Sequence, residues 1–93
     1  MKKEDEAVLI MKTLSNPHRL AILALLEKTK QDMCVNDIAD KIGISQSLTS
    51  HQLAYLEARG VVKGHRYGQT TCYKPMKNSI SRKISHVIGQ LLG

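Results

Sequence analysis

The chain has 93 residues, a hydrophobic content of 42% and a formal net charge of +6 at pH 7. Its length fits one domain, which we expect to span residues 1–93, and its two cysteines are too few for a secreted disulfide framework. No uncharged apolar stretch approaches the roughly 20 residues needed to cross a bilayer, so we expect a cytoplasmic protein with no membrane partner. The positive charge is compatible with a polyanionic partner.

Two helices are predicted before the first polar break. Residues 4–14 form the first, with Val8 and other apolar residues loosely on one side. Asn16 suits the N-cap of the second helix and Pro17 its first position, where no amide hydrogen is needed. Apolar residues cover most of the circumference from His18 to Lys28, so we expect this helix to be the most buried one.

A short helix, a glycine and a longer helix follow. Apolar spacings of three and four predict a helix over residues 35–42, which Gly43 ends. Ser45 is a good N-cap for a helix that runs to about Arg59, and Gly60 stops it. Two helices of these lengths around a glycine turn are typical of a helix-turn-helix.

The chain changes character after Gly60. β-favouring residues on either side of Tyr67-Gly68-Gln69 predict a two-stranded hairpin within residues 61–76, closed by Pro75. A last helix is expected over residues 79–92. The predicted fold is therefore a mainly helical α+β winged helix, with four helices, a hairpin and a fifth helix.

An apolar stripe runs along the last predicted helix. A chain this short buries only about two-thirds of its unfolded surface, so the stripe favours a dimer interface over a free surface. The residues of the stripe are Ile80, Ile84, Val87, Ile88 and Leu91.

The helix that begins at Ser45 offers short and mid-length hydrogen-bonding side chains, with no acidic residue in its first turns. Helix-turn-helix proteins place this part of the second helix against base edges, where Gln suits adenine and Ser, Thr and His are versatile. We therefore expect binding to double-stranded DNA through Gln46, Ser47, Thr49, Ser50 and His51.

Cations around this helix are candidate contacts to the phosphate backbone. Lys41 ends the preceding helix, Arg59 closes the reading helix, and Lys63 and Arg66 lie on the hairpin. Arg66 and the neighbouring Tyr67 are placed to reach phosphates or an adjacent minor groove.

Four segments in this order resemble the ArsR/SmtB family of bacterial repressors: NPHRLAILALLE at 16–27, CVNDIADKI at 34–42, SQSLTSHQLAYL at 45–56 and GVV at 60–62. The resemblance implies a homodimer formed by the first and last helices, which brings Val8 into the interface. It also implies repression by binding a palindromic operator, with release when an inducer binds, although the inducer is unknown. One departure is Leu48-Thr49, where the family more often has the apolar residue second.

The metal sites that the resemblance implies are not matched by good ligands. The first kind of site lies near Cys34, which stands alone here, and one thiolate cannot hold a soft metal. The second kind falls on Lys77, Ser79, Gln90 and Gly93. We therefore expect neither of these metal sites, and no cofactor.

Cys34 and Cys72 remain as candidates for a thiol switch. Sulfur- and redox-responsive members of the resembling family also carry a cysteine where Cys34 stands. Pairing with Cys72, on the second hairpin strand, requires Cα atoms within about 7 Å, which the sequence does not establish. If they do not form a switch, Cys34 is a small buried apolar residue and Cys72 is an ordinary packed residue of its strand. A metal held by both cysteines and a histidine stays open as an alternative.

No enzyme is expected, because no phosphate loop, His-Glu-x-x-His motif or carboxylate pair stands out. The main alternative to DNA binding is a winged helix that binds a protein or RNA. Such versions tend to carry large apolar or acidic residues on the second helix of the motif, and residues 46–51 favour DNA instead.

Overall fold

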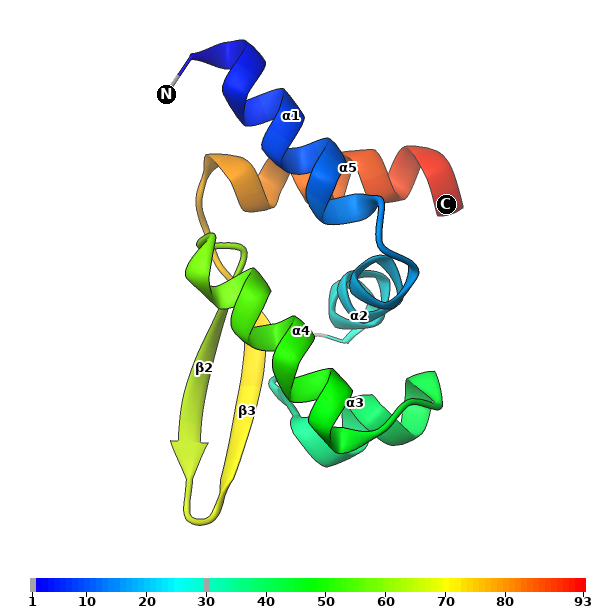
Figure 1. The fold of residues 1–93 in the computed structure, drawn as a ribbon, viewed down its shortest axis with the longest axis vertical. Coiled ribbons are helices and arrows are strands. Elements are labelled where there is room, and N and C mark those ends of the chain that lie inside the picture. Colours follow the sequence, from blue (N-terminus) through cyan, green and yellow to red (C-terminus); the bar gives the residue numbers. More distant parts are fainter. Residues whose placement is uncertain (1, 30) are drawn as a thin grey trace.

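The computed structural model describes residues 2–29 and 31–93, which form five helices and a three-stranded sheet (Figure 1). The predicted helices and hairpin are confirmed, with boundaries shifted by only a residue or two. Within the described residues, no helix is both long and apolar enough to cross a bilayer. In chain order the elements are α1 (Lys3–Leu14), α2 (Pro17–Lys28), β1 (Met33–Cys34), α3 (Val35–Ile42), α4 (Gln46–Ala58), β2 (Val62–Tyr67), β3 (Thr70–Pro75) and α5 (Ser79–Leu92).

Local capping explains where the helices begin and end. The side-chain oxygen of Asn16 accepts hydrogen bonds from the backbone N–H groups of His18, at 2.9 Å, and Arg19, at 3.1 Å. Ser45 caps α4 in the same way, and Gly43 ends α3 with a left-handed φ of 83°. These side chains and this glycine satisfy backbone groups that a helix end leaves unpaired, as predicted.

The start of α5 depends on Asn78, a cap that sequence analysis did not single out. Its Oδ1 accepts from the Ser81 backbone N–H at 2.8 Å, and its Nδ2 donates to the Gly60 carbonyl at 2.7 Å. One side chain thus caps α5 and ties it to the turn that follows α4.

The sheet has a third strand that was not predicted. Its order is β1-β3-β2 with both pairings antiparallel, so β3 is the central strand. β1 is only two residues long, too short to show strand alternation in the sequence.

Neighbouring rows of side chains point to opposite faces of this sheet, because successive residues of a strand alternate. One row joins Met33, Tyr73 and Gly64, and the next joins Cys34, Cys72 and His65. Met33 and Tyr73 belong to the hydrophobic core, so the row of cysteines and histidine points to the other face.

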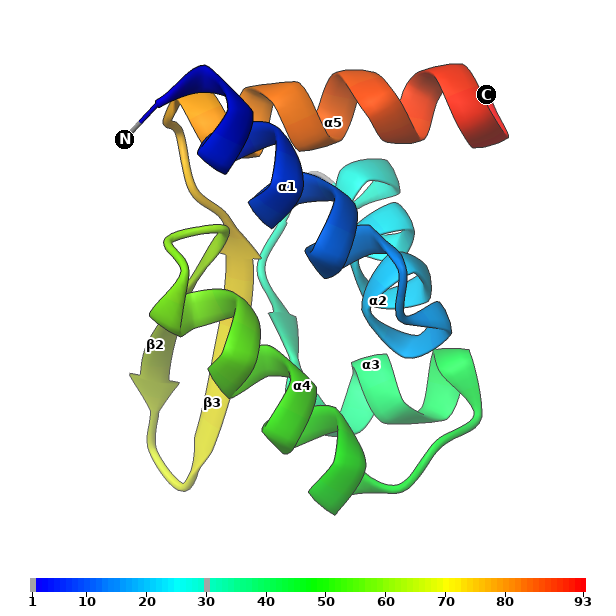
Figure 2. The same ribbon diagram turned by 45° about the horizontal axis from the view of Figure 1, so that its top comes forward.

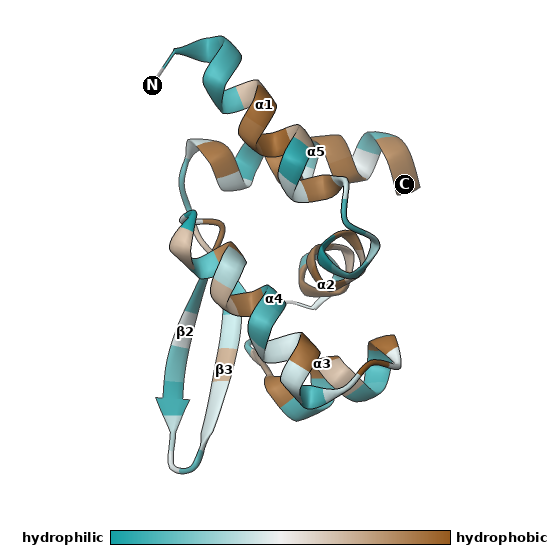
Figure 3. Cartoon of the chain, in the orientation of Figure 1, coloured by the Kyte–Doolittle hydropathy of each residue, from teal (hydrophilic) through white to brown (hydrophobic). Residues whose placement is uncertain are grey.

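α2 lies at the centre of the core, as its apolar circumference predicts. Ile22, Leu23 and Leu26 are at most 2% exposed. Figure 3 shows α2 as largely hydrophobic, whereas β2 is hydrophilic along most of its length.

The elements divide between two ends of the molecule, whose longest extent is 39 Å. α1 and α5 lie at one end, and the start of α4 and the tip of the β2–β3 hairpin lie toward the other (Figures 1 and 2). A surface on α1 and α5 is therefore separate from one formed by α4 and the hairpin.

Candidate nucleic-acid interface

The two sides of α4 differ in chemistry. Gln52, Leu53 and Leu56 are buried on the inner side. The outer side of the first two turns carries exposed polar side chains and no acidic residue in its first turn. The exposed predicted residues are Gln46, Ser47, Ser50 and His51, whose spacing of three and four places them on one face of the helix.

Thr49 does not belong to this face, and its prediction as a DNA contact was wrong. It is fully buried, and its Oγ1 donates to the Ser45 carbonyl at 2.8 Å. It precedes Gln52 and Leu53 by three and four residues, so the helical period turns it toward the core. Leu48 is only half-buried. The threonine of the Leu48-Thr49 pair therefore takes the inward position.

Arg19 connects α4 to the end of α1. Its guanidinium donates to the carbonyls of Thr13 and Lys12, at 2.9 and 3.0 Å. It also donates to Gln52 Oε1 at 3.2 Å and lies 4.0 Å from the centre of the Tyr55 ring. Sequence analysis missed this role, although Arg19 stands inside the NPHRL segment. The contacts fix how the exposed face of α4 is oriented.

The predicted cations surround α4 unevenly. Lys41 on α3 and Lys63 and Arg66 on β2 are exposed. Arg59 is also exposed, but its guanidinium lies 3.5 Å from the centre of the Tyr55 ring and donates to the Tyr55 carbonyl at 3.2 Å. Arg59 is thus held against α4, whereas the other three are exposed on two other elements, α3 and β2.

Tyr67 lies near the hairpin tip and is 56% exposed. Its hydroxyl donates to Asp32 Oδ2 at 3.2 Å. This hydrogen bond, with the negative charge of Asp32, raises the pKa of Tyr67 above its ordinary value. The hydroxyl is therefore already occupied in the free protein, and a contact to DNA would have to displace or share Asp32.

Cys34 and Cys72 form a disulfide between β1 and β3. They are directly paired in the sheet, with Cα atoms 3.7 Å apart, so the distance condition for pairing is met. Cys34 is half-buried, and Cys72 is 3% exposed. The bond joins the residue before α3 to the hairpin, and so links the helix-turn-helix to the wing.

His65, on β2, lies directly opposite Cys72. Its Nε2 is the buried side-chain nitrogen or oxygen that lacks a hydrogen-bond partner among the described residues. Within residues 2–29 and 31–93, no group of three or more His, Cys, Asp or Glu side chains is arranged to hold a metal ion.

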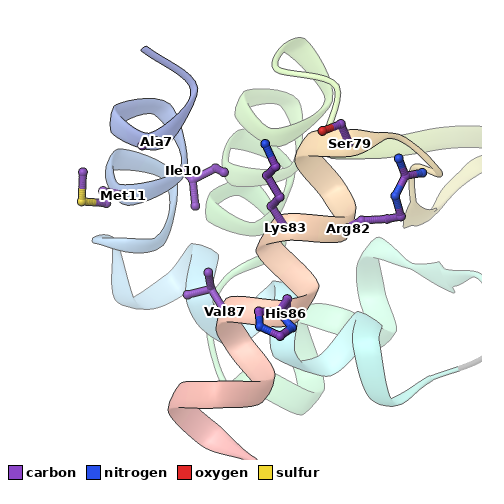
Figure 4. Close-up of a pocket in the computed structure, with 8 residues that line it drawn as sticks. All are labelled: Ala7, Ile10, Met11, Ser79, Arg82, Lys83, His86 and Val87. Atoms are coloured by element: carbon purple, nitrogen blue, oxygen red, sulfur yellow. The ribbon is translucent and has the colours of Figure 1, made fainter. Parts of the chain in front are cut away.

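An apolar groove of about 580 Å³ runs between α1 and α5 (Figure 4). Lys83, beside the groove, forms an ion pair with Glu6 across the two helices. The residues lining the groove are Ala7, Ile10, Met11, Ser79, Arg82, Lys83, His86 and Val87.

More of the apolar stripe of α5 is buried in the core of its own subunit than we predicted. Ile84 and Ile88 are 1% and 6% exposed, so their prediction as dimer contacts was wrong. They belong to the hydrophobic core, and a stripe in sequence does not distinguish core packing from an interface. Ile80 and Val87 are half-buried. The large apolar side chains left exposed at this end are Val8, Met11, Leu91 and Leu92.

The arrangement of α3, α4 and the β2–β3 hairpin defines a winged helix-turn-helix protein. The family model described as "Bacterial regulatory protein, arsR family" matches residues 16–63. The chain belongs to this family.

Three relatives are similar to the chain over most of its length. It is 35% identical to the nodulation protein NolR of Rhizobium meliloti, over 97% of this chain and 70% of NolR. It is 32% identical to a homolog of the transcriptional repressor SmtB from Synechocystis, over 84% of this chain but only 58% of that protein. It is also 32% identical to the transcriptional activator HlyU of Vibrio cholerae, over 89% of this chain and 75% of HlyU.

Solved structures support the same fold. HlyU from Vibrio cholerae matches with a TM-score of 0.82 and 26% identity over the full length of both chains. The homodimeric winged helix-turn-helix DNA-binding domain of Mb0332 from Mycobacterium bovis matches with a TM-score of 0.75 and 29% identity, over 89% of this chain and 75% of that one.

Proposed function

We propose that this protein is a homodimeric transcriptional repressor that binds a palindromic operator in double-stranded DNA. The observation that carries the proposal is the exposed face of α4, formed by Gln46, Ser47, Ser50 and His51. These side chains donate and accept hydrogen bonds, and no acidic residue in the first turn of α4 repels phosphate. An α-helix with such a face fits the major groove, where each base pair presents a distinct pattern of donors and acceptors.

Phosphate contacts would hold α4 in register. Lys41 is exposed on α3, and Lys63 and Arg66 are exposed on β2, so both the preceding helix and the wing supply cations. Such contacts position a protein on DNA without reading sequence. Arg59 has a smaller part in this proposal, because it is already held against Tyr55.

The proposed second copy packs on the end of the molecule formed by α1 and α5. Val8, Met11, Leu91 and Leu92 are 44–65% exposed there, beside the apolar groove. This end lies away from the start of α4 and the wing tip (Figure 1). A two-fold dimer would present two α4 helices to half-sites about one helical turn apart, which requires a palindromic operator.

The proposed signal acts on Cys34 and Cys72. Oxidation of the two thiols by a peroxide or polysulfide would remove two electrons and two protons and form the disulfide. Because the bond ties the start of α3 to the wing, it constrains two elements that must fit DNA together. We assign the operator-binding state to the dithiol form and release to the disulfide form.

Binding of a selected duplex tests the DNA-reading face. An operator is first enriched from a random duplex library, and its affinity is then measured by fluorescence anisotropy. Gln46→Ala and Ser50→Ala are each expected to weaken binding by roughly 5- to 150-fold, since a lost base contact costs about 1–3 kcal/mol. Gln31→Ala, an exposed glutamine in the loop before β1, is the matched control. Unchanged affinity in both α4 variants, with the fold retained, would contradict the assignment.

The same titration with the oxidised protein tests the switch. The disulfide form is expected to bind the selected duplex more weakly, and Cys34→Ser should abolish the difference. Equal affinity of the two wild-type forms would reject the switch and leave DNA binding in place. Transcription in vitro from a promoter containing the operator tests repression, which requires that added protein lowers the yield of transcript.

A further inference from the structure

The two sulfurs of the disulfide differ in access. Cys34 is half-buried and is the N-cap residue of α3, with no side-chain capping hydrogen bond, whereas Cys72 is in the central strand and is 3% exposed. A thiol arriving from solvent therefore reaches the sulfur of Cys34 first. The unpaired N–H groups at the start of a helix also favour a thiolate at Cys34.

His65 flanks Cys72 on the strand opposite β1. Residues directly opposite on antiparallel strands share a face and bring their Cβ atoms to within about 5.5 Å. The Nε2 of His65 is buried without a hydrogen-bond partner while the disulfide is closed. A thiol or thiolate on Cys72 exists only when the disulfide is open, and it would supply that partner.

Tyr67 and Asp32 cover this row of three residues. Tyr67 lies two residues beyond His65 on β2, and Asp32 lies two residues before Cys34, just ahead of β1. The hydrogen bond between Tyr67 and Asp32 therefore joins β2 to the residue before β1, across the central strand β3 that carries Cys72. This cover is consistent with the low exposure of Cys72 and keeps solvent from its sulfur.

Other charged groups lie on the same face of the sheet as Cys72. Lys63 and Lys74 are directly paired on β2 and β3, two residues from the row in the direction away from the wing tip. Asp32 is the acidic residue facing the row, and its carboxylate accepts the hydrogen bond from Tyr67. His65 is the residue directly opposite Cys72 on β2, and its imidazole can donate or accept a proton.

We propose that the disulfide exchanges with a low-molecular-weight thiol at Cys34, and that His65 carries the proton to and from Cys72. This deepens the thiol switch proposed above and rests on it. The incoming thiolate forms a bond to the Cys34 sulfur, and the electron pair of the Cys34–Cys72 bond passes to the Cys72 sulfur. His65 donates the proton that makes Cys72 a thiol.

The reverse path closes the disulfide. A mixed disulfide between Cys34 and the small thiol is attacked by the Cys72 sulfur after His65 takes its proton. The Cys34–Cys72 bond forms, and the small thiol leaves with the electron pair of its bond to Cys34. No net oxidation or reduction occurs in either exchange step, so the only co-reactant is the small thiol or its disulfide.

Single-cysteine variants test which sulfur reacts with the small molecule. Reduced Cys72→Ser and Cys34→Ser proteins are mixed with oxidised glutathione, and the adduct is followed by mass spectrometry. Cys72→Ser, which keeps Cys34, is expected to form the adduct at least about tenfold faster than Cys34→Ser. Faster reaction of Cys34→Ser would overturn the assignment of Cys34 as the point of entry.

The role of His65 is tested by the rate at which the mixed disulfide closes. In His65→Gln, closure at about pH 7 is expected to slow at least tenfold, and this deficit should shrink at alkaline pH, where the Cys72 thiol loses its proton without a base. His18→Gln is the matched control, and thermal melting confirms that each variant is folded. Closure at the wild-type rate in folded His65→Gln would overturn the role of His65, whereas the adduct test does not depend on that variant.

Anisotropy with the selected duplex separates this inference from the switch that it deepens. If exchange occurs at Cys34 and depends on His65, but the dithiol and disulfide forms bind DNA equally well, the proposed exchange is supported and the switch is rejected. If the dithiol and disulfide forms differ in DNA affinity, but exchange occurs at Cys72 and His65→Gln has no effect, the switch is supported and the proposed exchange is rejected.

Discussion

Tyr73 fills space on the core side of the wing that Gly64 leaves open. A Cβ on Gly64 would lie 2.8 Å from Tyr73 Cε2 and 3.2 Å from Thr71 Cγ2, so a side chain there would push the ring away. The backbone N–H of Gly64 also donates to Glu57 Oε2 at 2.9 Å. One glycine thus lets the wing approach α4 while the tyrosine ring remains in the core.

The ionisation of Tyr73 should limit stability at alkaline pH. Burial and then the negative charge of Glu57 raise its pKa above 10.0, so the folded state holds this proton more tightly than the unfolded state. The stabilisation is fully present below about pH 10 and is lost as pH rises through the folded pKa. Tyr73→Phe should therefore lose less stability than wild type between about pH 9 and 11 in urea denaturation.

Tyr55→Phe is the control for this prediction, because it also removes a phenol hydroxyl and keeps the ring. It should follow the wild-type curve at alkaline pH. An equal alkaline loss in Tyr73→Phe and wild type would contradict the role assigned to Tyr73.

Among the elements, those with local signals could be predicted from sequence and those that depend on distant pairing could not. Asn16, Gly43 and Ser45 cap helices through backbone groups within three or four residues, so their types alone mark the boundaries. β1 exists because two residues pair with a strand almost forty positions away, and the Cys34–Cys72 bond follows from that pairing.

The candidate site also has parts that could be predicted from sequence and parts that could not. The polar face of α4 could be predicted because it depends only on the types of the side chains in that segment. Whether Leu48 or Thr49 turns inward depends on which side of α4 packs against the neighbouring elements. Thr49 shares the buried side through the helical period. Ile84 and Ile88 were misassigned because a core and a subunit interface demand the same apolar stripe.

The junction between α4, the wing and α5 should depend on Asn78. Asn78→Ala removes the α5 cap and leaves the Gly60 carbonyl without this donor. We expect a loss of about 1–2 kcal/mol in the free energy of unfolding, measured by urea denaturation. Asn36→Ala, at an exposed position in the first turn of α3, should cost much less. Equal small losses in the two variants would show that Asn78 is not a structural cap.

At the scale of the whole molecule, the proposed function requires two surfaces at opposite ends, one for a second copy and one for DNA. The net charge of +6 supports the second, because each phosphate neutralised by a cation releases counterions. The exposed apolar residues of α1 and α5 support the first.

Leu91→Glu should split the dimer. Leu91 is 65% exposed in the single subunit, so the substitution spares the core, but it places a charge in the proposed apolar contact. Sedimentation velocity should show a monomer, with unchanged helical content by circular dichroism. Gln90→Glu adds the same charge on the adjacent exposed residue and is the comparison. A dimer that persists in Leu91→Glu would place the interface elsewhere.

The most direct test of DNA binding is a titration of the reduced protein against the selected palindromic duplex and a scrambled duplex of equal length and composition. We predict that the palindrome binds at least about a thousandfold more tightly. Binding to both should weaken steeply as salt rises from about 50 to 200 mM, because the basic side chains displace counterions. Equal affinity for the two duplexes would contradict the proposal that the exposed face of α4 reads a DNA sequence.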